Sequence, residues 1–597
     1  MIPPPPARII GLTMALALTL PHTNRLRADT MVIDHAQSDY AVAIAPDASA
    51  TVRQAAAELV EDLGTMTGAH LPLVTGRARQ PAIYVGAGPH LPGGLAGAGL
   101  TALPEESFVL KIRNGDILLA GVGDRGTLYA VYTFLEKYAG ARWYAPDATV
   151  LPHLDTLRIG RLDERETPGF AYRDTDEYLV AKSAAWGAHL KLNGVSLPAQ
   201  GDLGGVNRLF NGAENFFGLV PPGTYFATHP EYFSLINGAR SDKAQLCLTD
   251  PDVLRIVTDA LIDEARRNPG ELTLGLSPND ERNGNCQCDR CRASDARYGA
   301  ASGTLLNFVN QVAAGVQAAF PERKIWVETL AYQYTQRAPT QGTIAPADNV
   351  LVCLAPIHAC VFHPLAADPK NADSNAALLS WGAVAPGHLQ VWHYVTNFAN
   401  YLQPFPDWDE LGADMGYYQA HGVSGMFCEG GYQSNGEFMA MRTWVIGHLL
   451  WDPHQDVWAL VQDFCNGYYG AAGPDIYRYL RLYHELLPLP DMHMTIYDNT
   501  AAPYLKPDLL ARANLLLDHA ATAAETPQIK DRVEGVRLGL RYVALMQQRQ
   551  APIPDADKPA YRQRLDAFVN DLQHHGITQM AEDENRAAWI EGMEKLD

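Results

Sequence analysis

The chain has 597 residues, of which 47% are apolar and 19% are charged, an ordinary globular composition that excludes a disordered or collagen-like protein. Its formal net charge is −21, and this acidic balance argues against nucleic acid as the main partner because phosphate binding needs a basic face. At roughly 150 residues per domain the length predicts several domains, fewer if one of them is a barrel.

Residues 1–28 have the pattern of a signal peptide. Arg8 precedes an apolar run from Ile9 to Leu20, which is too short to span a bilayer but has the length of a signal-peptide hydrophobic core. We therefore expect an exported protein, periplasmic or extracellular. No later apolar run is long enough for a membrane span, and the sequence does not indicate an oligomeric state.

Residues 29–160 predict a small α/β domain. Two strand-like apolar runs, 41–46 and 82–88, flank a segment with helical spacing that ends in glycine. Residues 107–122 follow as two strands joined by Asn114-Gly115, which is a strong hairpin signal.

The next segment, Gly-Val-Gly-Asp-Arg-Gly at 121–126, matches the G-x-G-x-x-G of dinucleotide-binding folds. Its preceding strand is the second arm of the hairpin and is therefore antiparallel to its neighbour, whereas a dinucleotide motif begins a parallel unit. We interpret the glycines as a tight strand-to-helix turn, and we expect no cofactor to be required for catalysis.

Residues 165–452 alternate between short apolar strands and helical stretches, which predicts a (β/α)8 TIM barrel with its active site where the strands end. Residues 453–597 carry apolar residues at helical spacing and predict an α-helical C-terminal domain. The eight expected strands cover residues 169–174, 192–197, 231–236, 272–280, 324–332, 350–356, 389–395 and 424–431.

Four carboxylates fall near predicted strand ends: Asp280 and Glu281 after the fourth strand, Glu328 on the fifth, and Glu429 on the eighth. Glycoside hydrolysis needs two such groups on either side of the scissile bond. Strands four and eight face each other across a barrel mouth. We therefore predict Asp280 as the general acid and Glu429 as the base or nucleophile, with Glu328 as the substitute for either.

Sugars present apolar ring faces and hydroxyl rims, so aromatic and polar side chains at the same strand ends are candidate substrate contacts. Arg173 would clamp a carboxylate or a hydroxyl pair, or else form an internal ion pair. The candidates are Arg173, Asn193, Tyr332, Trp392, His393, Tyr394 and Tyr432.

Three cysteines, Cys286, Cys288 and Cys291, form a C-x-C-x-x-C cluster. With Cys247 as a fourth ligand they would make a structural zinc site. The alternative in an oxidising compartment is a local disulfide with a free thiol. Either role is structural.

The segments "THPEYFSLINGAR" (228–240), "LSPNDERNGNCQCDRCRA" (276–293) and "VWHYVTNFANYLQPFPD" (391–407) resemble an uncharacterised bacterial family, domain of unknown function 4838, similar in layout to α-glucuronidases. The resemblance implies a small α/β domain, a barrel and a helical tail. It also implies an exo-acting glycoside hydrolase on a plant or microbial polysaccharide, with a uronic acid as one candidate sugar, and it points to Asp280 and Glu429.

Two alternatives stay open. The adjacent pair Asp280-Glu281 is similar to that of β-N-acetylhexosaminidases, which implies a substrate-assisted enzyme in which Glu281 protonates the leaving group and Asp280 steadies the acetamido group. A catalytically silent glycan-binding protein is the alternative of another class, because a fold alone does not prove chemistry.

Overall fold

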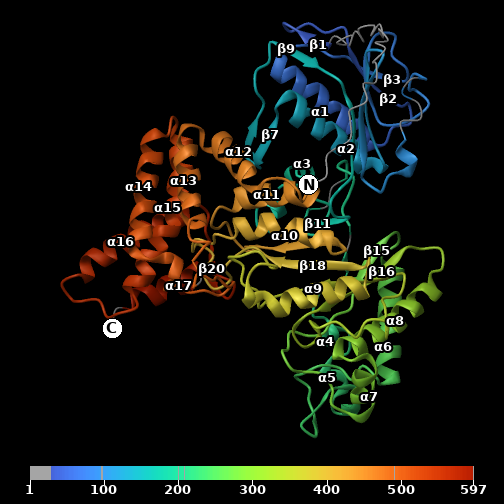
Figure 1. Cartoon of the computed structure of the whole chain (residues 1–597), viewed down its shortest axis with the longest axis vertical. Coiled ribbons are helices and arrows are strands. Elements are labelled where there is room, and N and C mark those ends of the chain that lie inside the picture. The colour runs from blue at the N-terminus through green and yellow to red at the C-terminus, as the bar shows by residue number, and fades with distance from the viewer. Residues whose placement is uncertain are drawn as a thin grey trace, which may run out of the picture.

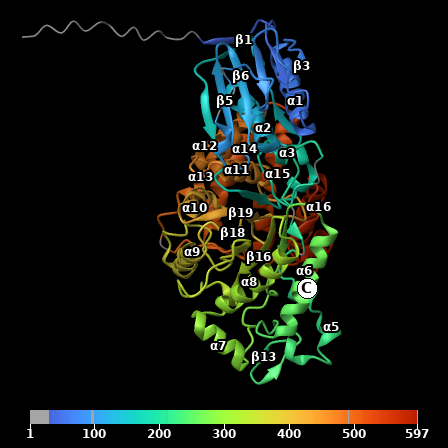
Figure 2. The ribbon, with the colours of Figure 1, turned by 90° about the vertical axis from the view of Figure 1, so that its right-hand side faces the viewer.

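The computed structural model shows an elongated molecule in which the N-terminal sheet lies at one end and helix α7 (Asp289–Tyr298) at the other (Figures 1 and 2). The expected signal peptide lies outside the described residues. No described helix has the length and apolar character needed to cross a bilayer. The structure describes residues 29–93, 95, 99–198, 201–207, 209–210, 212–489 and 491–595.

The N-terminal domain has a six-stranded mixed sheet packed against helices α1 (Ala50–Thr67) and α2 (Gly123–Phe134). Helix α1 begins at the Ser49 cap and ends at Gly68, whose φ of 71° suits glycine. A separate pair, β1 (Thr30–Asp34) with β9 (Thr156–Ile159), lies beside it. The sheet order is β10 (Asp163–Glu166), β5 (Phe108–Arg113), β6 (Asp116–Gly121), β4 (Ala82–Val85), β2 (Ala41–Ile44) and β3 (Leu73–Thr75).

The glycine-rich segment is a tight turn between β6 and α2. β6 is antiparallel to β5, as expected from the hairpin. A Cβ on Gly121 would lie 2.0 Å from the backbone carbon of Gly126, so the two segments meet only because glycine stands there. The interpretation as a turn is confirmed, and the neighbouring Arg125 pairs with Glu106.

The central sheet has seven strands, all paired in parallel. Six of them confirm predicted strands. Helices lie between these strands or follow them in the chain, namely α6 (Pro251–Arg267), α8 (Ala301–Ala319), α9 (Ala372–Val384), α10 (Trp408–Ala420) and α11 (Met439–Trp451). The strand order is β11 (Tyr172–Thr175), β19 (Val423–Glu429), β18 (Leu389–Tyr394), β17 (Val350–Leu354), β16 (Ile325–Ala331), β15 (Leu272–Gly275) and β12 (Leu209–Phe210).

This sheet is curved. A cavity of about 600 Å³ is lined by one residue or more from each of β11, β15, β16, β17 and β18, together with Ser424 of β19. A flat sheet would not surround one cavity in this way. The arrangement is a parallel half-barrel, and an eighth strand that would close it is not formed by the described residues.

Two predicted strands are wrong. Residues 192–197 turn instead of extending, although Asn193 N–H donates to Arg173 O (3.0 Å) and Asn193 O accepts from Asn207 N–H (2.8 Å), which ties β11 to the segment before β12. Residues 231–236 end in the two-residue strand β13 (Leu235–Ile236), which pairs antiparallel with β14 (Ala239–Arg240). The physical reason is the Asn237-Gly238 turn, where both residues have positive φ and favour a hairpin.

The C-terminal region is helical as predicted, with one addition. A short hairpin, β20 (Gln579–Ala581) with β21 (Glu584–Asn585), follows α16, and Phe398 O near the central sheet accepts from Glu582 N–H (2.8 Å). Figure 1 shows these helices stacked beside the central sheet. They are α12 (Val457–Tyr469), α13 (Gly473–His484), α14 (Pro507–Ala523), α15 (Pro527–Gln548), α16 (Lys558–His574) and α17 (Arg586–Glu594).

Candidate active site

A pocket of about 210 Å³ lies at the carboxyl ends of the parallel strands. Carboxyl ends of parallel strands meet at one edge of a sheet, which is where the sequence places the site. Four of its lining residues are acids and five are aromatic. The lining residues are Glu214, Asp280, Leu330, Tyr332, Ala355, Ile357, Trp392, Tyr394, Phe398, Glu429, Tyr497 and Glu582.

Glu429 is the last residue of β19, and its carboxyl is the best-defined polar group of the pocket. The indole Nε1 of Trp392 donates a hydrogen bond to Glu429 Oε2 at 2.7 Å. Burial raises the pKa of Glu429 to about 7, and the nearby charges of Glu582 and Glu214 act in the same direction. A carboxyl with this pKa keeps its proton near neutral pH and can deliver it to a leaving oxygen.

The backbone beyond Glu429 is held by two acids from the segment after β11, the half-buried Asp176 and the buried Glu177. Asp176 Oδ1 accepts from Gly430 N–H at 2.8 Å, and Glu177 Oε2 accepts from Gly431 N–H at 3.1 Å. A Cβ on Gly430 would lie 2.3 Å from the carboxyl carbon of Glu177, so only glycine allows this close packing. The turn therefore fixes where Glu429 points.

Asp280 and Glu214 bring two further carboxyls to the pocket. Asp280 follows β15, is exposed, and is hydrogen-bonded by the Tyr332 side chain. Glu214 follows β12, and burial together with the charges of Asp280 and Glu582 raises its pKa to about 7. The sequence missed Glu214 because the third strand was placed at 231–236, some twenty residues too late.

Two lining residues come from the C-terminal region. Glu582 lies in the turn of the β20–β21 hairpin, and burial raises its pKa, assisted by the charges of Asp583 and Asp280. Tyr497 lies in the segment between α13 and α14. Neither has a local sequence signal, because only tertiary packing brings these segments to the sheet edge.

The structure brings together five predicted site residues: Asp280, Glu429, Tyr332, Trp392 and Tyr394 all line the pocket. Tyr432 is exposed, and its pKa is raised by burial and by the charges of Glu582 and Glu429, which places it at the rim.

Two predicted acids are not in the pocket lining. Glu281 is exposed. Glu328 shares the inner face of β16 with Leu330 but lies two residues further from the mouth, where burial raises its pKa to about 7.

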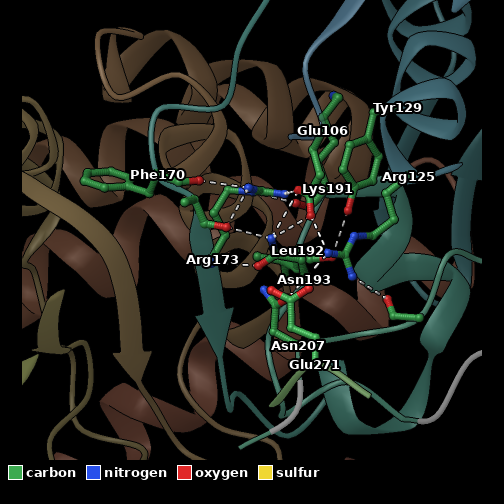
Figure 3. Close-up of polar contacts among 12 residues, drawn as sticks. Glu106, Arg125, Tyr129, Phe170, Arg173, Lys191, Leu192, Asn193, Asn207 and Glu271 are labelled. Carbon is green, nitrogen blue, oxygen red and sulfur yellow. Dashed lines mark hydrogen bonds and ion pairs between the residues drawn. The ribbon is translucent and has the colours of Figure 1, made fainter. Parts of the chain in front are cut away.

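Arg173 is not a substrate contact. Its side chain is fully buried and forms an ion pair with Glu106 of the N-terminal domain, while Nε donates to Lys191 O and Nη1 to Phe170 O, both at 2.8 Å (Figure 3). Side chains alternate along a strand, and since Tyr172 faces the cavity inside the sheet, Arg173 faces outward. The internal ion pair is the correct alternative.

The prediction that Asn193 and His393 contact the substrate is also wrong, because both side chains point away from the pocket. Asn193 Nδ2 donates to Glu106 Oε1 (3.0 Å) and to Ala171 O (2.8 Å), inside the network drawn in Figure 3. His393 lies between Trp392 and Tyr394 on β18 and so points to the opposite face, where its Nε2 is 3.4 Å from Glu410 Oε2 of α10. Both side chains are buried away from the pocket.

The four predicted cysteines meet beyond β15. The Cys247 sulfur is 3.7 Å from that of Cys288 and 3.8 Å from that of Cys291, and the four Sγ atoms lie within 4.8 Å of one another. A zinc tetrathiolate with Zn–S of about 2.3 Å has sulfur–sulfur edges of about 3.8 Å, whereas a disulfide needs about 2.05 Å. The donor set fits zinc better than a disulfide.

Comparisons with known proteins match glycoside hydrolases in fold and, over the N-terminal domain, in sequence. The structure is similar to a family GH115 4-O-methyl-α-glucuronidase, BtGH115A, with specificity for decorated arabinogalactans, at a TM-score of 0.56 and 12% identity over 90% of this chain and 76% of that one. It is also similar to a GH138 enzyme targeting pectin rhamnogalacturonan II, at a TM-score of 0.49 and 9% identity over 93% of this chain and 97% of that one.

The sequence itself matches two family models. Residues 26–134 match the glycosyl hydrolase family 67 N-terminus, and residues 143–481 match the domain of unknown function DUF4838. The second match covers more than half of the chain, so the chain belongs to the DUF4838 family. A search of curated protein sequences finds no match.

Proposed function

We propose that the protein is an exo-acting glycoside hydrolase in which Glu429 is the general acid. The observation that carries the proposal is the half-buried Glu429 carboxyl, with a pKa of about 7, facing a pocket that also holds three other acids and five aromatic rings. A protonated carboxyl beside a second, ionised one is the pairing that glycoside hydrolysis requires. A pocket closed by C-terminal segments suits the end of a sugar chain.

The positions of the strands alone predict Asp280 as the general acid, whereas the raised pKa of Glu429 supports the opposite assignment, with Glu429 as the acid. Asp280, exposed beside Tyr332, is then the carboxylate that activates water or attacks the sugar. Glu214, next to it, is the substitute, because its raised pKa responds to the charge of Asp280. The half-barrel would be closed into an eight-stranded barrel by the Asn193 segment.

The charge of the pocket favours a neutral or amino sugar. The described lining residues include four acids and no lysine or arginine, so a uronate would meet unscreened negative charge. A uronic acid remains the second candidate, because the N-terminal domain matches glycosyl hydrolase family 67 and the fold resembles a 4-O-methyl-α-glucuronidase.

The substrate-assisted hexosaminidase hypothesis receives little support, since Glu281 is exposed and outside the pocket lining. A silent glycan-binding protein would bind sugars without turnover.

The test is a panel of nitrophenyl glycosides, including N-acetylglucosaminide, and uronic-acid oligosaccharides, measured with wild type, Glu429→Gln and Glu281→Gln. We expect turnover on at least one neutral or amino sugar, a loss of about 10²–10⁴-fold in Glu429→Gln, and near-normal turnover in Glu281→Gln. Full activity of Glu429→Gln would refute the acid assignment, and binding without any turnover would support the silent protein.

We also propose that Cys247, Cys286, Cys288 and Cys291 hold a structural zinc ion. The support is the spacing of the four sulfurs and their place beyond β15, where Cys286 Sγ also accepts from Leu235 N–H at 3.3 Å. A closed four-ligand site leaves no position for substrate, so the ion would stabilise the fold without entering catalysis. Export through the N-terminal segment remains part of the proposal.

A further inference from the structure

A second group of metal-binding side chains lies far from the cysteine cluster in sequence. Cys360, His363 and Asp368 come from the segment between β17 and α9, and His493 comes from the segment between α13 and α14. One donor atom of each lies within 4.8 Å of every other. Cys360 is buried, and the Asp368 side chain is only 2% exposed.

The four donor atoms lie close enough together to surround one small ion. Cys360 Sγ is 3.6 Å from His493 Nδ1 and 3.9 Å from His363 Nδ1. Asp368 Oδ2 is 2.9 Å from His493 Nδ1 and 3.1 Å from His363 Nδ1. Zinc bonds of about 2.3 Å to sulfur and 2.0–2.2 Å to nitrogen and oxygen give tetrahedral edges of about 3.4–3.6 Å, which fall within the observed range of 2.9–3.9 Å.

The orientation of His363 points to a cation. Its Nε2 is 3.1 Å from Leu487 O, and a carbonyl only accepts, so Nε2 carries the proton. In the neutral ring Nδ1 then presents a lone pair toward the Asp368 carboxylate. A metal ion between them would bind both electron-rich groups and so remove their repulsion. A backbone carbonyl on the second ring nitrogen is the usual support of a metal-bound histidine.

The other ligands are also held in place. Asn371 fixes Cys360 from both sides, because its Oδ1 accepts from Cys360 N–H (2.6 Å) and its Nδ2 donates to Cys360 O (3.0 Å). Asp368 Oδ1 accepts from Lys370 N–H at 2.9 Å, which leaves Oδ2 for the cluster. The site is therefore built before any ion arrives.

We propose that Cys360, His363, Asp368 and His493 bind a structural Zn²⁺ ion. One thiolate, two imidazoles and one carboxylate in a tetrahedral arrangement favour zinc over the oxygen-seeking Mg²⁺ and Ca²⁺. All four positions are filled by protein groups, so the ion is not a catalyst. This inference does not depend on the sugar or on the roles of the pocket acids.

The ion would anchor the segment that delivers Tyr497 to the pocket. Beyond His493, Met494 O accepts from Val361 N–H (2.9 Å) and Ile496 O accepts from Phe398 N–H (2.8 Å). Tyr497 follows directly and lines the pocket. Zinc at this junction would fasten the connection between α13 and α14 to the sheet edge and so hold one wall of the pocket.

The experiment measures zinc per chain by mass spectrometry of the purified full-length protein after exhaustive dialysis. We expect the double variant Cys360→Ser/His493→Gln to lose one zinc ion relative to wild type. The matched control is His574→Ala/His575→Ala, which removes both histidines of a separate, largely exposed group with Asp531 and should keep the wild-type zinc content. An unchanged zinc content in the Cys360 variant overturns the proposal.

A second measurement avoids any dependence on the folding of the variants. Wild type loaded with ¹¹³Cd²⁺ should give a cadmium resonance with one-sulfur coordination, well upfield of the position of a tetrathiolate. Its presence supports the proposal whether or not the cysteine cluster is also loaded. A spectrum with a tetrathiolate signal alone, or with no protein-bound cadmium at all, overturns it.

Discussion

Trp392 and Glu429 lie on the neighbouring strands β18 and β19, and the 2.7 Å hydrogen bond from the Trp392 indole to Glu429 Oε2 is the polar contact that orients the carboxyl in the pocket. A donor to a carboxylate stabilises its charged form, so this contact lowers the pKa of Glu429 while burial raises it. The balance between the two sets the pH at which the carboxyl loses its proton.

Replacing Trp392 by Phe should therefore shift the alkaline limb of the kcat/KM profile to higher pH. The general acid must be protonated, so activity falls as pH rises through the pKa of Glu429, about 7, and loss of the hydrogen bond raises that pKa further. Phe398→Leu, which changes the same pocket without removing a polar group, should leave the limb in place. A limb that moves downward in Trp392→Phe would contradict the assignment.

Glu328→Gln should stabilise the protein at alkaline pH and keep its activity. The pKa of Glu328 is about 7 in the folded chain and about 4.5 when exposed, so the folded state holds a proton that the unfolded state has lost between those values. Stability from this group is thus present at low pH and lost as pH rises through about 7.

We expect the variant to exceed wild type by about 1–3 kcal/mol at pH 8 and to match it near pH 4.5. Thermal unfolding at both pH values measures this, with the exposed Glu281→Gln as the control. An inactive Glu328→Gln would instead move the second catalytic carboxyl to β16.

Arg173→Met should weaken the junction between the N-terminal domain and the central sheet. It removes one of the two guanidinium partners of the buried Glu106 carboxylate, leaving Arg125 and Asn193. The expected cost is about 3 kcal/mol in the unfolding free energy. Because Arg173 lies outside the pocket, any remaining activity should fall equally on uronic and neutral substrates.

The control for Arg173 is Arg255→Met on α6, an exposed arginine whose pairs are helical surface pairs worth well under about 1 kcal/mol. A selective loss of activity on uronic substrates in Arg173→Met would restore Arg173 as a substrate contact.

Tyr497→Ala should raise KM by about tenfold, equivalent to about 1.4 kcal/mol of lost ring contact, with a smaller effect on kcat. The ring lines the pocket, but the acids that act on the glycosidic bond are supplied by other segments. Leu489→Ala, an exposed residue of the same connection, is the matched control. Steady-state kinetics on the best substrate of the panel would measure both, and a large fall in kcat alone would contradict the expected role.

Much of this site was predictable from local patterns. Asp280 and Glu429 follow from apolar strands that end in polar residues, and their strands were found because β-branched and apolar runs are local signals. The predicted substrate contacts of Arg173 and His393 were wrong because side chains alternate along a strand. Their neighbours Tyr172 and Trp392 face inward, so Arg173 and His393 face outward.

Other parts could not be predicted from local sequence. β12 has two residues and offers almost no apolar run, which hid Glu214. His493 stands 125 residues from Asp368, and only the return of the chain to the sheet edge brings the two together.

The DUF4838 match ends at residue 481, before Tyr497 and Glu582 close the pocket. A chain cut at that boundary would keep Glu429, Asp280 and Glu214 but would lose one side of the enclosure, leaving an open groove. A groove admits a polysaccharide along its length, so the helical tail would decide whether the same acids attack the terminus of a glycan or its interior.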